Sequence, residues 1–315
     1  MNPRHPVYII SKGRADRRLT IRTLDALAVP YTLVVEPHEF DEYARYVDLS
    51  RIVTTPFSDL GEGSIPARNF VWEHSISRGA RRHWIMDDNI AAFCRLNNNL
   101  QVKVTDGTVF RVMEDFVDRY SNVAIAGPQY DHFAKSKCVH PAFCANTRVY
   151  SCLLIDNALQ HRWRGRYNED TDLCLRVMKD GLCTILFYAF TQEKATTMTM
   201  RGGNTDELYR DDGRLLMAQS LVDQHPDVAR VSWKFNRWQH HVDYRPFLSN
   251  ALKYRDGYAP PSGVNEYGMR LVSVKEPILF NEQAQDIMNM STVEVGSRSI
   301  TYQAQNGQQV KDGRK

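Results

Sequence analysis

Apolar and polar positions alternate along the first part of the chain in blocks that predict strands followed by helices. Val7–Ile10 and Thr32–Val35 are short apolar runs closed by loop-forming residues, a pattern typical of buried strands. Apolar residues repeat at helical spacing over about residues 16–27 and 67–78, and the second helix leads into the apolar run Trp84–Met86. Repeated strand–helix units predict an α/β fold with a mainly parallel sheet and helices on both faces.

The later part of the chain predicts a mixture of elements and then a polar tail. We expect strands over residues 100–104, 123–126, 147–155 and 182–190, and helices over 109–120 and 168–179. Thr196–Asn204 is polar and contains two glycines, which predicts a mobile loop. Periodicity weakens after about residue 256, so we predict one domain over residues 1–255 and a C-terminal extension over 256–315 whose end is disordered.

Composition narrows the class of protein. The 315 residues are 43% hydrophobic and 24% charged, which is ordinary for a globular protein. No apolar run approaches the ~20 residues that span a bilayer, and the first ten residues lack the pattern of a signal peptide. We therefore expect a cytoplasmic protein with no membrane partner. The six cysteines form no C-x-x-C pair, which favours reduced thiols, and a net charge of +3 does not by itself indicate a polyanionic partner.

The most informative motif is Asp87-Asp88-Asn89, directly after the apolar run that precedes it. Ligands bind outside the carboxyl ends of the strands in parallel sheets, so the motif lies where a site is expected. Its carboxylate and amide oxygens suit Mg²⁺ or Mn²⁺, which would bridge the phosphates of a nucleotide diphosphate. The alternative is a turn, because Asp and Asn often end strands by bonding their own backbone.

Two other motifs accompany this triplet in a set order. Ile65–Asn69 opens the preceding helix, and Glu169-Asp170 opens a later helix that is followed by Gly181. This order resembles the inverting GT-A glycosyltransferases over about residues 6–195, with Asn89 in place of the last Asp of that family's D-x-D motif. The resemblance implies a donor-binding half over about residues 1–125 and an acceptor half over about 126–255.

The resemblance also implies the roles of particular residues. Asp170 matches the general base, with Glu169 as its neighbour, and a carboxylate suits removal of a proton from an acceptor hydroxyl. The alternative for both, and for Asn168 and Asp172, is stabilisation of a helix N-terminus. Contacts with a donor, a UDP-sugar carrying a hexosyl or N-acetylhexosaminyl group, are implied for Ser11, Lys12, Gly13, Arg14, Arg68, Asn69, Asp87 and Asp88.

The donor residues and the metal ligands each leave an alternative open. Ser11–Arg14 also fits a basic surface turn, and Arg68 with Asn69 a solvated helix start. Many GT-A enzymes complete the metal shell with a C-terminal histidine, for which His241 is the first candidate and His240 the second, ahead of His225. A single histidine is more often packed or solvated than bound to a metal.

A closer resemblance involves four segments: YIISKGRA, GSIPARNFVWEH, the D-D-N triplet and FNRWQHHVDY. Together they are similar to the phage TET-associated glycosyltransferases, which add sugars to 5-hydroxymethylpyrimidines, notably 5-hydroxymethylcytosine, in DNA. That resemblance implies a DNA acceptor, and the host bacterial cytoplasm as the location of a phage-encoded chain. Aromatic and basic residues that could stack on bases and contact phosphates are Arg162, Trp163, Arg164, Arg166, Lys234, Arg237 and Trp238.

Other functions compete with this one. The aromatic–basic clusters also fit a core whose surface is covered by arginine stems. A GT-A enzyme acting on a polysaccharide, lipid or protein is the nearest alternative. A nucleotidyltransferase would normally have a Gly-rich phosphate loop, which Ser11–Arg14 only faintly suggests. A non-catalytic DNA-binding relative is disfavoured because both acidic motifs are retained.

Overall fold

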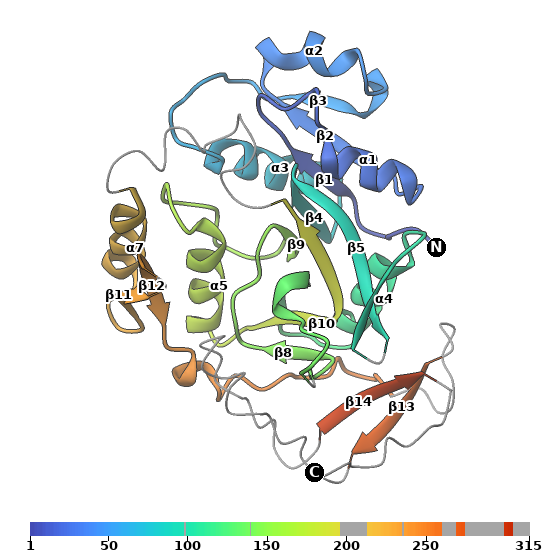
Figure 1. The fold of residues 1–315 in the computed structure, drawn as a ribbon, viewed down its shortest axis with the longest axis vertical. Helices are drawn as coiled ribbons and strands as arrows, with labels where there is room; N and C mark the ends of the chain where they lie inside the picture. Colours follow the sequence, from blue (N-terminus) through green and yellow to red (C-terminus); the bar gives the residue numbers. More distant parts are fainter. Residues whose placement is uncertain are drawn as a thin grey trace.

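A ten-stranded mixed sheet forms the centre of the computed structural model (Figure 1). The structure describes residues 1–97, 99–138, 140–195, 213–234 and 236–259, together with the backbone of 269–274 and 299–304. The strands lie in the order β3-β2-β1-β4-β9-β7-β10-β5-β6, and β8 pairs with β10. No helix in these ranges is long and apolar enough to cross a membrane.

The first four strands are parallel to one another. β1 pairs with β2 and with β4, and β2 pairs with β3. Their bounds are β1 (Val7–Ile10), β2 (Thr32–Val35), β3 (Ile52–Thr54) and β4 (Arg82–Asp87). Because the carboxyl ends of parallel strands meet at one edge, the residues after β1 and β4 lie side by side, with Ile10 paired to Asp87.

The remaining strands make the sheet mixed. β9 is antiparallel to both β4 and β7, β10 is parallel to β7, and β5 is antiparallel to β10 and β6. Their bounds are β5 (Ile90–Asn97), β6 (Leu100–Lys103), β7 (Val123–Tyr130), β8 (Phe143–Ala145), β9 (Cys152–Asp156) and β10 (Cys183–Lys194). The α/β class and the mixed, partly parallel sheet predicted from the sequence are confirmed.

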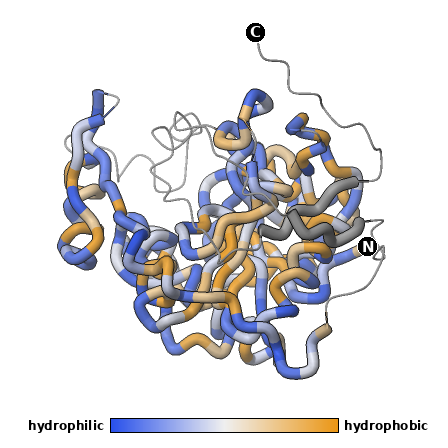
Figure 2. Tube along the Cα trace, turned by 90° about the horizontal axis from the view of Figure 1, so that it is seen from below, coloured by the Kyte–Doolittle hydropathy of each residue, from blue (hydrophilic) through white to orange (hydrophobic). Residues whose placement is uncertain are grey.

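Helices cover both faces of the sheet, as expected. One face packs against α1 (Leu19–Ala26) and α4 (Thr108–Val117), and the other against α3 (Ile65–Ser77) and α5 (Glu169–Lys179). Apolar residues gather at the strands in the centre of the fold (Figure 2). Shorter elements are η1 (Pro37–Glu39), α2 (Phe40–Ala44), η2 (Leu49–Arg51), η3 (Asp131–Phe133) and η4 (Arg245–Phe247).

Several elements differ from the pattern-based expectation. The triplet is followed by a strand, β5, that the sequence analysis does not predict. β7 continues past residue 126 to Tyr130, and β10 continues past residue 190 to Lys194. The strand expected over residues 147–155 begins only at Cys152. Tertiary pairing sets these ends, since β10 pairs with three different strands.

The C-terminal part contributes α7 (Gly213–Gln224) and two hairpins. α7 packs against the hairpin of β11 (Ala229–Lys234) and β12 (Arg237–Val242), at the left of Figure 1. β13 (Met269–Val274) and β14 (Ser299–Ala304) pair with each other. The loop expected at Thr196–Asn204 and the tail Asn306–Lys315 lie outside the described residues, and the domain boundaries stay predictions.

Candidate active site

The acidic triplet forms the turn between β4 and β5. Thr20 of α1 holds this turn: its hydroxyl donates to the Asp87 carbonyl at 2.6 Å and accepts from the Ile90 amide at 2.9 Å. Its own amide donates to the Asp88 carbonyl. The backbone is therefore fixed by a neighbouring helix, which leaves the three side chains of the triplet free to contact other groups.

Asp88 faces the loop after β1. Its carboxylate accepts hydrogen bonds from Ser11 Oγ at 2.6 Å and from the Arg14 guanidinium. Tyr43 of the α2 segment reinforces the loop, because its hydroxyl contacts Ser11 Oγ at 2.6 Å and accepts from the Arg14 amide at 3.2 Å. Burial raises the pKa of Asp88 and outweighs the opposing effect of Arg14. Ser11 and Arg14, two of the predicted donor contacts, therefore touch the triplet directly.

Asp87 is held between two cations. Arg68 Nη2 donates to Asp87 Oδ1 at 2.9 Å, and Lys194 Nζ donates to Asp87 Oδ2 at 2.7 Å. Burial alone would raise the pKa of this carboxyl, but Lys194 and Arg68 more than offset it and hold the pKa below its usual range. Asp87 is therefore an anion over the whole physiological pH range.

Arg68 joins the two acidic motifs, which are far apart in the sequence. Only 3% of its side chain is exposed, and it stacks over the Trp163 ring with 4.7 Å between the guanidinium carbon and the ring centroid. Its Nε lies 3.5 Å from Glu169 Oε1, and its Nη1 lies 3.5 Å from Asp170 Oδ1. One buried guanidinium thus places Glu169 and Asp170 beside Asp87.

Asp170 is buried but weakly satisfied. Its Oδ2 accepts a hydrogen bond from the Ser151 amide at 3.1 Å, whereas Oδ1 is buried with no hydrogen-bond partner. Burial raises its pKa to about 7; Arg68 opposes this, and Glu169 and Asp87 reinforce it. A carboxyl with this pKa exchanges a proton easily near neutral pH, as a general base must.

Helix capping does not account for this motif. Asn168, directly before α5, makes no capping hydrogen bond and donates instead to the Met217 carbonyl at 2.6 Å. Asp170 bonds to Ser151 rather than to its own helix. Asp172 is fully buried and contacts Arg164, Arg176 and His225, so it is part of a packed ion network.

Two residues of this cluster were missed by the sequence analysis. Lys194 ends β10, and its ammonium also donates to Ser151 Oγ at 2.6 Å. Tyr130 ends β7, and its hydroxyl contacts Ser151 Oγ at 2.7 Å. No local pattern marks them. Lys194 lies opposite Ile90, where β10 pairs with β5, and Tyr130 lies opposite Gln192, where β10 pairs with β7. Both residues lie four positions beyond the predicted ends of their strands, at residues 190 and 126.

The other predicted donor residues lie around this cluster with partners of their own. Lys12 donates to Glu36 at 3.0 Å and to Asp59 at 2.6 Å. Gly13 has a φ of 65°, which favours glycine, and its amide donates to Glu39. Asn69 exchanges two hydrogen bonds with the Trp163 backbone, at 2.9 and 3.0 Å, so it fixes that segment.

The triplet has the donor set that a hard divalent cation requires. Asn89 Oδ1 is buried with no hydrogen-bond partner, which fits a role as an oxygen ligand. Binding a cation there requires Lys194 or Arg14 to give up carboxylate oxygens that they now contact. The residues present therefore fit Mg²⁺ or Mn²⁺, provided that the metal ion takes the place of the Lys194 or Arg14 side chain at a carboxylate oxygen.

The candidate histidines do not join the triplet in this structure. His240 and His241 lie on β12, and His225 contacts Asp172 Oδ1 at 2.8 Å. Within the described ranges, one group of three acidic or histidine side chains has its ligand atoms within 4.8 Å of one another, and it comprises Glu36, His38 and Asp59. Lys12 already contacts both of these carboxylates.

The first predicted DNA-binding cluster is largely engaged inside the protein. Trp163 is 2% exposed and packs against Trp72, which places it in the core rather than on a DNA-binding surface. Arg162 pairs with Glu73 at 2.6 Å and lies over the Trp72 ring. Arg164 pairs with Asp172 at 3.0 Å, although half of its side chain is exposed. Arg166 is exposed.

The second predicted DNA-binding cluster lies on the hairpin of β11 and β12. Lys234 and Arg237 pair across the turn and are both exposed. Trp238 is 39% exposed and contacts Trp233 edge to face, with 5.0 Å between the ring centroids. This hairpin therefore presents aromatic and basic side chains to solvent.

The chain matches a known protein family. A model of the family described as TET-Associated Glycosyltransferase matches residues 5–203, more than half of the 315 residues. No curated protein matches the chain. Among solved structures, the chain is similar to a putative nucleotide-diphospho-sugar transferase from Desulfovibrio desulfuricans G20, with a TM-score of 0.34 and 9% sequence identity over 59% of this chain and 80% of that one.

Proposed function

The chain belongs to the TET-associated glycosyltransferase family and is a glycosyltransferase, and from that premise we propose its reaction. It moves a sugar from a nucleotide diphosphate sugar to the hydroxymethyl group of a 5-hydroxymethylpyrimidine, such as 5-hydroxymethylcytosine, in DNA. The observation that carries this proposal is the contact of Arg68 with Asp87, Glu169 and Asp170, which unites a diphosphate site with a candidate base.

The proposed chemistry is an inverting displacement. Asp170 accepts the proton of the acceptor hydroxyl while the oxygen attacks the anomeric carbon. The bond between that carbon and the phosphate oxygen breaks, and its electron pair leaves with the nucleoside diphosphate. The raised pKa of Asp170, about 7, matches this role, because a carboxylate with an ordinary pKa is a weaker base.

The donor diphosphate is proposed to lie between the triplet and the loop after β1. Asp87, Asp88 and Asn89 would hold Mg²⁺ or Mn²⁺, which when bound neutralises the charge of the leaving diphosphate. Arg14 contacts Asp88 and Lys194 contacts Asp87. When either side chain gives up its carboxylate to the metal, its positive charge stays next to the donor phosphates. Ser11 and Gly13 belong to the loop after β1, which would border the diphosphate next to Asp88.

The decisive test uses hydroxymethylated DNA, Mn²⁺ and a panel of nucleotide sugars. Digestion to nucleosides followed by mass spectrometry should detect a hexose or N-acetylhexosamine on the modified pyrimidine. Unmodified DNA is the control. Absence of labelling with every donor would direct the search to polysaccharide, lipid or protein acceptors.

The stereochemistry of the product tests the assigned base. A single displacement assisted by Asp170 converts an α-linked donor into a β-linked product. The proton coupling at the anomeric carbon of the isolated nucleoside distinguishes the two linkages. An α-linked product would contradict the role of Asp170 as the base in a single displacement.

A further inference from the structure

A series of nearly parallel rings leads from Asp170 to the protein surface. The rings of Tyr150 and Tyr130 are 6.0 Å apart between centroids and 16° from parallel. The rings of Tyr130 and His132 are 5.4 Å apart and 15° from parallel. Tyr130 ends β7 and His132 lies in η3, so the sheet edge and the following turn hold the series in place.

The inner end of this series is linked to the candidate base through its neighbours Thr171 and Ser151. The Tyr150 hydroxyl accepts a hydrogen bond from Thr171 Oγ1, next to Asp170, at 3.0 Å. The Tyr130 hydroxyl contacts Ser151 Oγ at 2.7 Å, and the Ser151 amide donates to Asp170. An acceptor hydroxyl that reaches Asp170 along these rings therefore lies within a few atoms of the carboxylate that takes up its proton.

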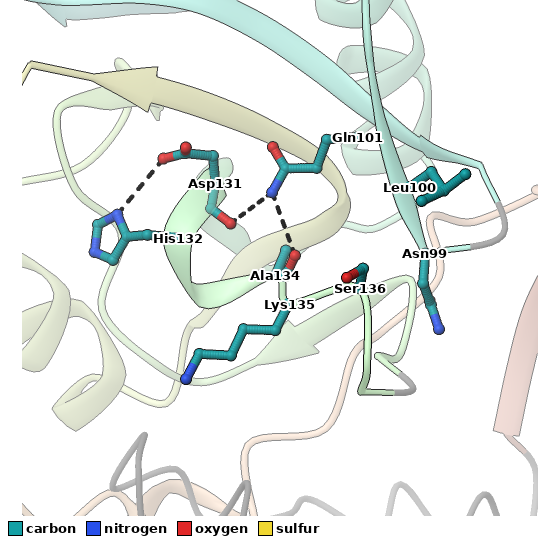
Figure 3. Close-up of a pocket in the computed structure, with 8 residues that line it drawn as sticks. All are labelled: Asn99, Leu100, Gln101, Asp131, His132, Ala134, Lys135 and Ser136. Carbon is teal, nitrogen blue, oxygen red and sulfur yellow. Dashed lines mark hydrogen bonds and ion pairs between the residues drawn. The ribbon is translucent and has the colours of Figure 1, made fainter.

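The outer end opens to solvent beside a hollow. The His132 side chain is 61% exposed. The hollow has a volume of about 380 Å³, within the range of ~300–1,000 Å³ typical of small-ligand sites. Gln101, Asp131, Lys135 and Ser136 line it together with His132, and Gln101 crosses it to bond the Asp131 and Ala134 carbonyls (Figure 3).

Two ammonium groups accompany the hollow. Lys135 and Lys137 are exposed and lie on the segment after η3. Neither forms an ion pair with any residue in the part of the chain that the structure describes, whereas Arg162 and Arg164 are both paired with carboxylates. Asp131, which lies 3.5 Å from His132, is the one carboxylate that lines the hollow. Unpaired lysines next to an exposed ring are what a nucleic-acid strand requires for phosphate contacts and base stacking.

We propose that these residues, named here the ring surface (Tyr150, Tyr130, His132, Lys135 and Lys137), bind the acceptor DNA strand. The target pyrimidine lies at the inner end, with its hydroxymethyl group at Asp170, and a neighbouring base stacks at His132. Lys135 and Lys137 contact the phosphates of that strand. This inference rests on the proposed function, since it names the acceptor subsite of the same reaction.

The first test measures the effect of losing the exposed ring. His132→Ala should raise the KM for a hydroxymethylated oligonucleotide about tenfold, an effect expected from loss of one base–aromatic stack. The fall in kcat should be smaller than the rise in KM, because His132 does not touch Asp170. Tyr46→Ala is the matched control, since Tyr46 is an exposed aromatic residue (52%) on the donor side of the sheet and should leave the KM unchanged.

The second test needs no catalysis. Binding of a fluorescently labelled hydroxymethylated oligonucleotide is measured by anisotropy over a range of salt concentrations. Lys135→Ala combined with Lys137→Ala should reduce the slope of log Kd against log salt by about 1.4–1.8, the loss of two phosphate contacts. Lys253→Ala is the control, because this exposed lysine bonds through its backbone to Asn122, at the opposite end of β7.

The outcomes separate this inference from the proposed function. Wild-type transfer to hydroxymethylated DNA, with no change in the KM of His132→Ala and no change in the salt slope of the double lysine variant, would overturn the ring surface alone. Failure of the wild type to label any hydroxymethylated DNA would overturn the proposed function. Weaker transfer to an oligosaccharide by His132→Ala, with unchanged DNA binding, would assign the rings to a sugar and overturn this inference.

Discussion

Asp87 and Asp170 are two carboxylates beside the same arginine, yet their chemistry differs. Asp87 contacts Arg68 and Lys194 through direct hydrogen bonds, so its pKa lies below the usual range. Asp170 lies 3.5 Å from Arg68 and has one backbone hydrogen bond, so burial dominates and its pKa rises to about 7. The number of close cations, rather than burial itself, thus decides which carboxylate stays charged and which can accept a proton.

The largest expected effect comes from disabling the acidic triplet that contains Asp87 and its neighbour Asp88. An unneutralised diphosphate is a poor leaving group, so excess chelator should abolish transfer. Asp88→Ala should do the same, with donor turnover below detection and an unchanged circular dichroism spectrum. Restoring Mn²⁺ should restore the wild type but not the variant. Full wild-type activity in excess chelator would remove the metal from the mechanism.

Removing the basicity of Asp170, the proton-accepting carboxylate, should have the next largest effect. Asp170→Asn keeps the shape of the side chain but removes its basicity, so kcat should fall by about 10²–10⁴-fold. DNA affinity should remain nearly unchanged. Glu169→Gln is the matched comparison: Glu169 contacts Ser64 and Arg68, and its loss should lower kcat much less. Equal losses in the two variants would contradict the assignment of Asp170 as the base.

The pH dependence of the reaction sharpens the contrast. Only deprotonated Asp170 can act as a base, so activity should be lost as the pH falls through its folded-state pKa of about 7. The charged or titratable groups around Asp170 are Arg68, Glu169, Asp87, Tyr150, Tyr130 and Lys194. We expect kcat/KM, which reports on the free enzyme, to fall about tenfold per pH unit below 7 and to level off above it. A profile that is flat from pH 5 to 8 would contradict this prediction.

The smallest effects are expected at the basic residues outside the carboxylate cluster. Arg237→Ala should weaken DNA binding a few-fold, since its side chain is exposed on the hairpin. Arg164→Ala should also weaken it, although this arginine is tied to Asp172 and its loss also removes an internal partner. Anisotropy at two salt concentrations measures both, with thermal unfolding as the control for Arg164→Ala. Binding identical to the wild type in both variants would confine DNA contacts to other surfaces.

Sequence patterns predicted the first parallel strands well because their signals are local. Apolar runs gave β1, β2 and β4, and the triplet stands where β4 ends. The association of Ser11 and Arg14 with the triplet follows from strand order, since β1 and β4 pair directly. Family motifs then indicated Asp170 as the candidate base before any geometry was known.

Long-range packing decided the remainder, and no local pattern encodes it. Pairing of β10 with both β5 and β7 brings Lys194 and Tyr130 to the triplet, and only burial shows that Trp163 belongs to the core. The sequence by itself determined which residue types are present and which strand or helix carries them. The tertiary structure decided their charges, because a carboxyl's pKa depends on which cations lie within a few ångströms and on how much water remains around it.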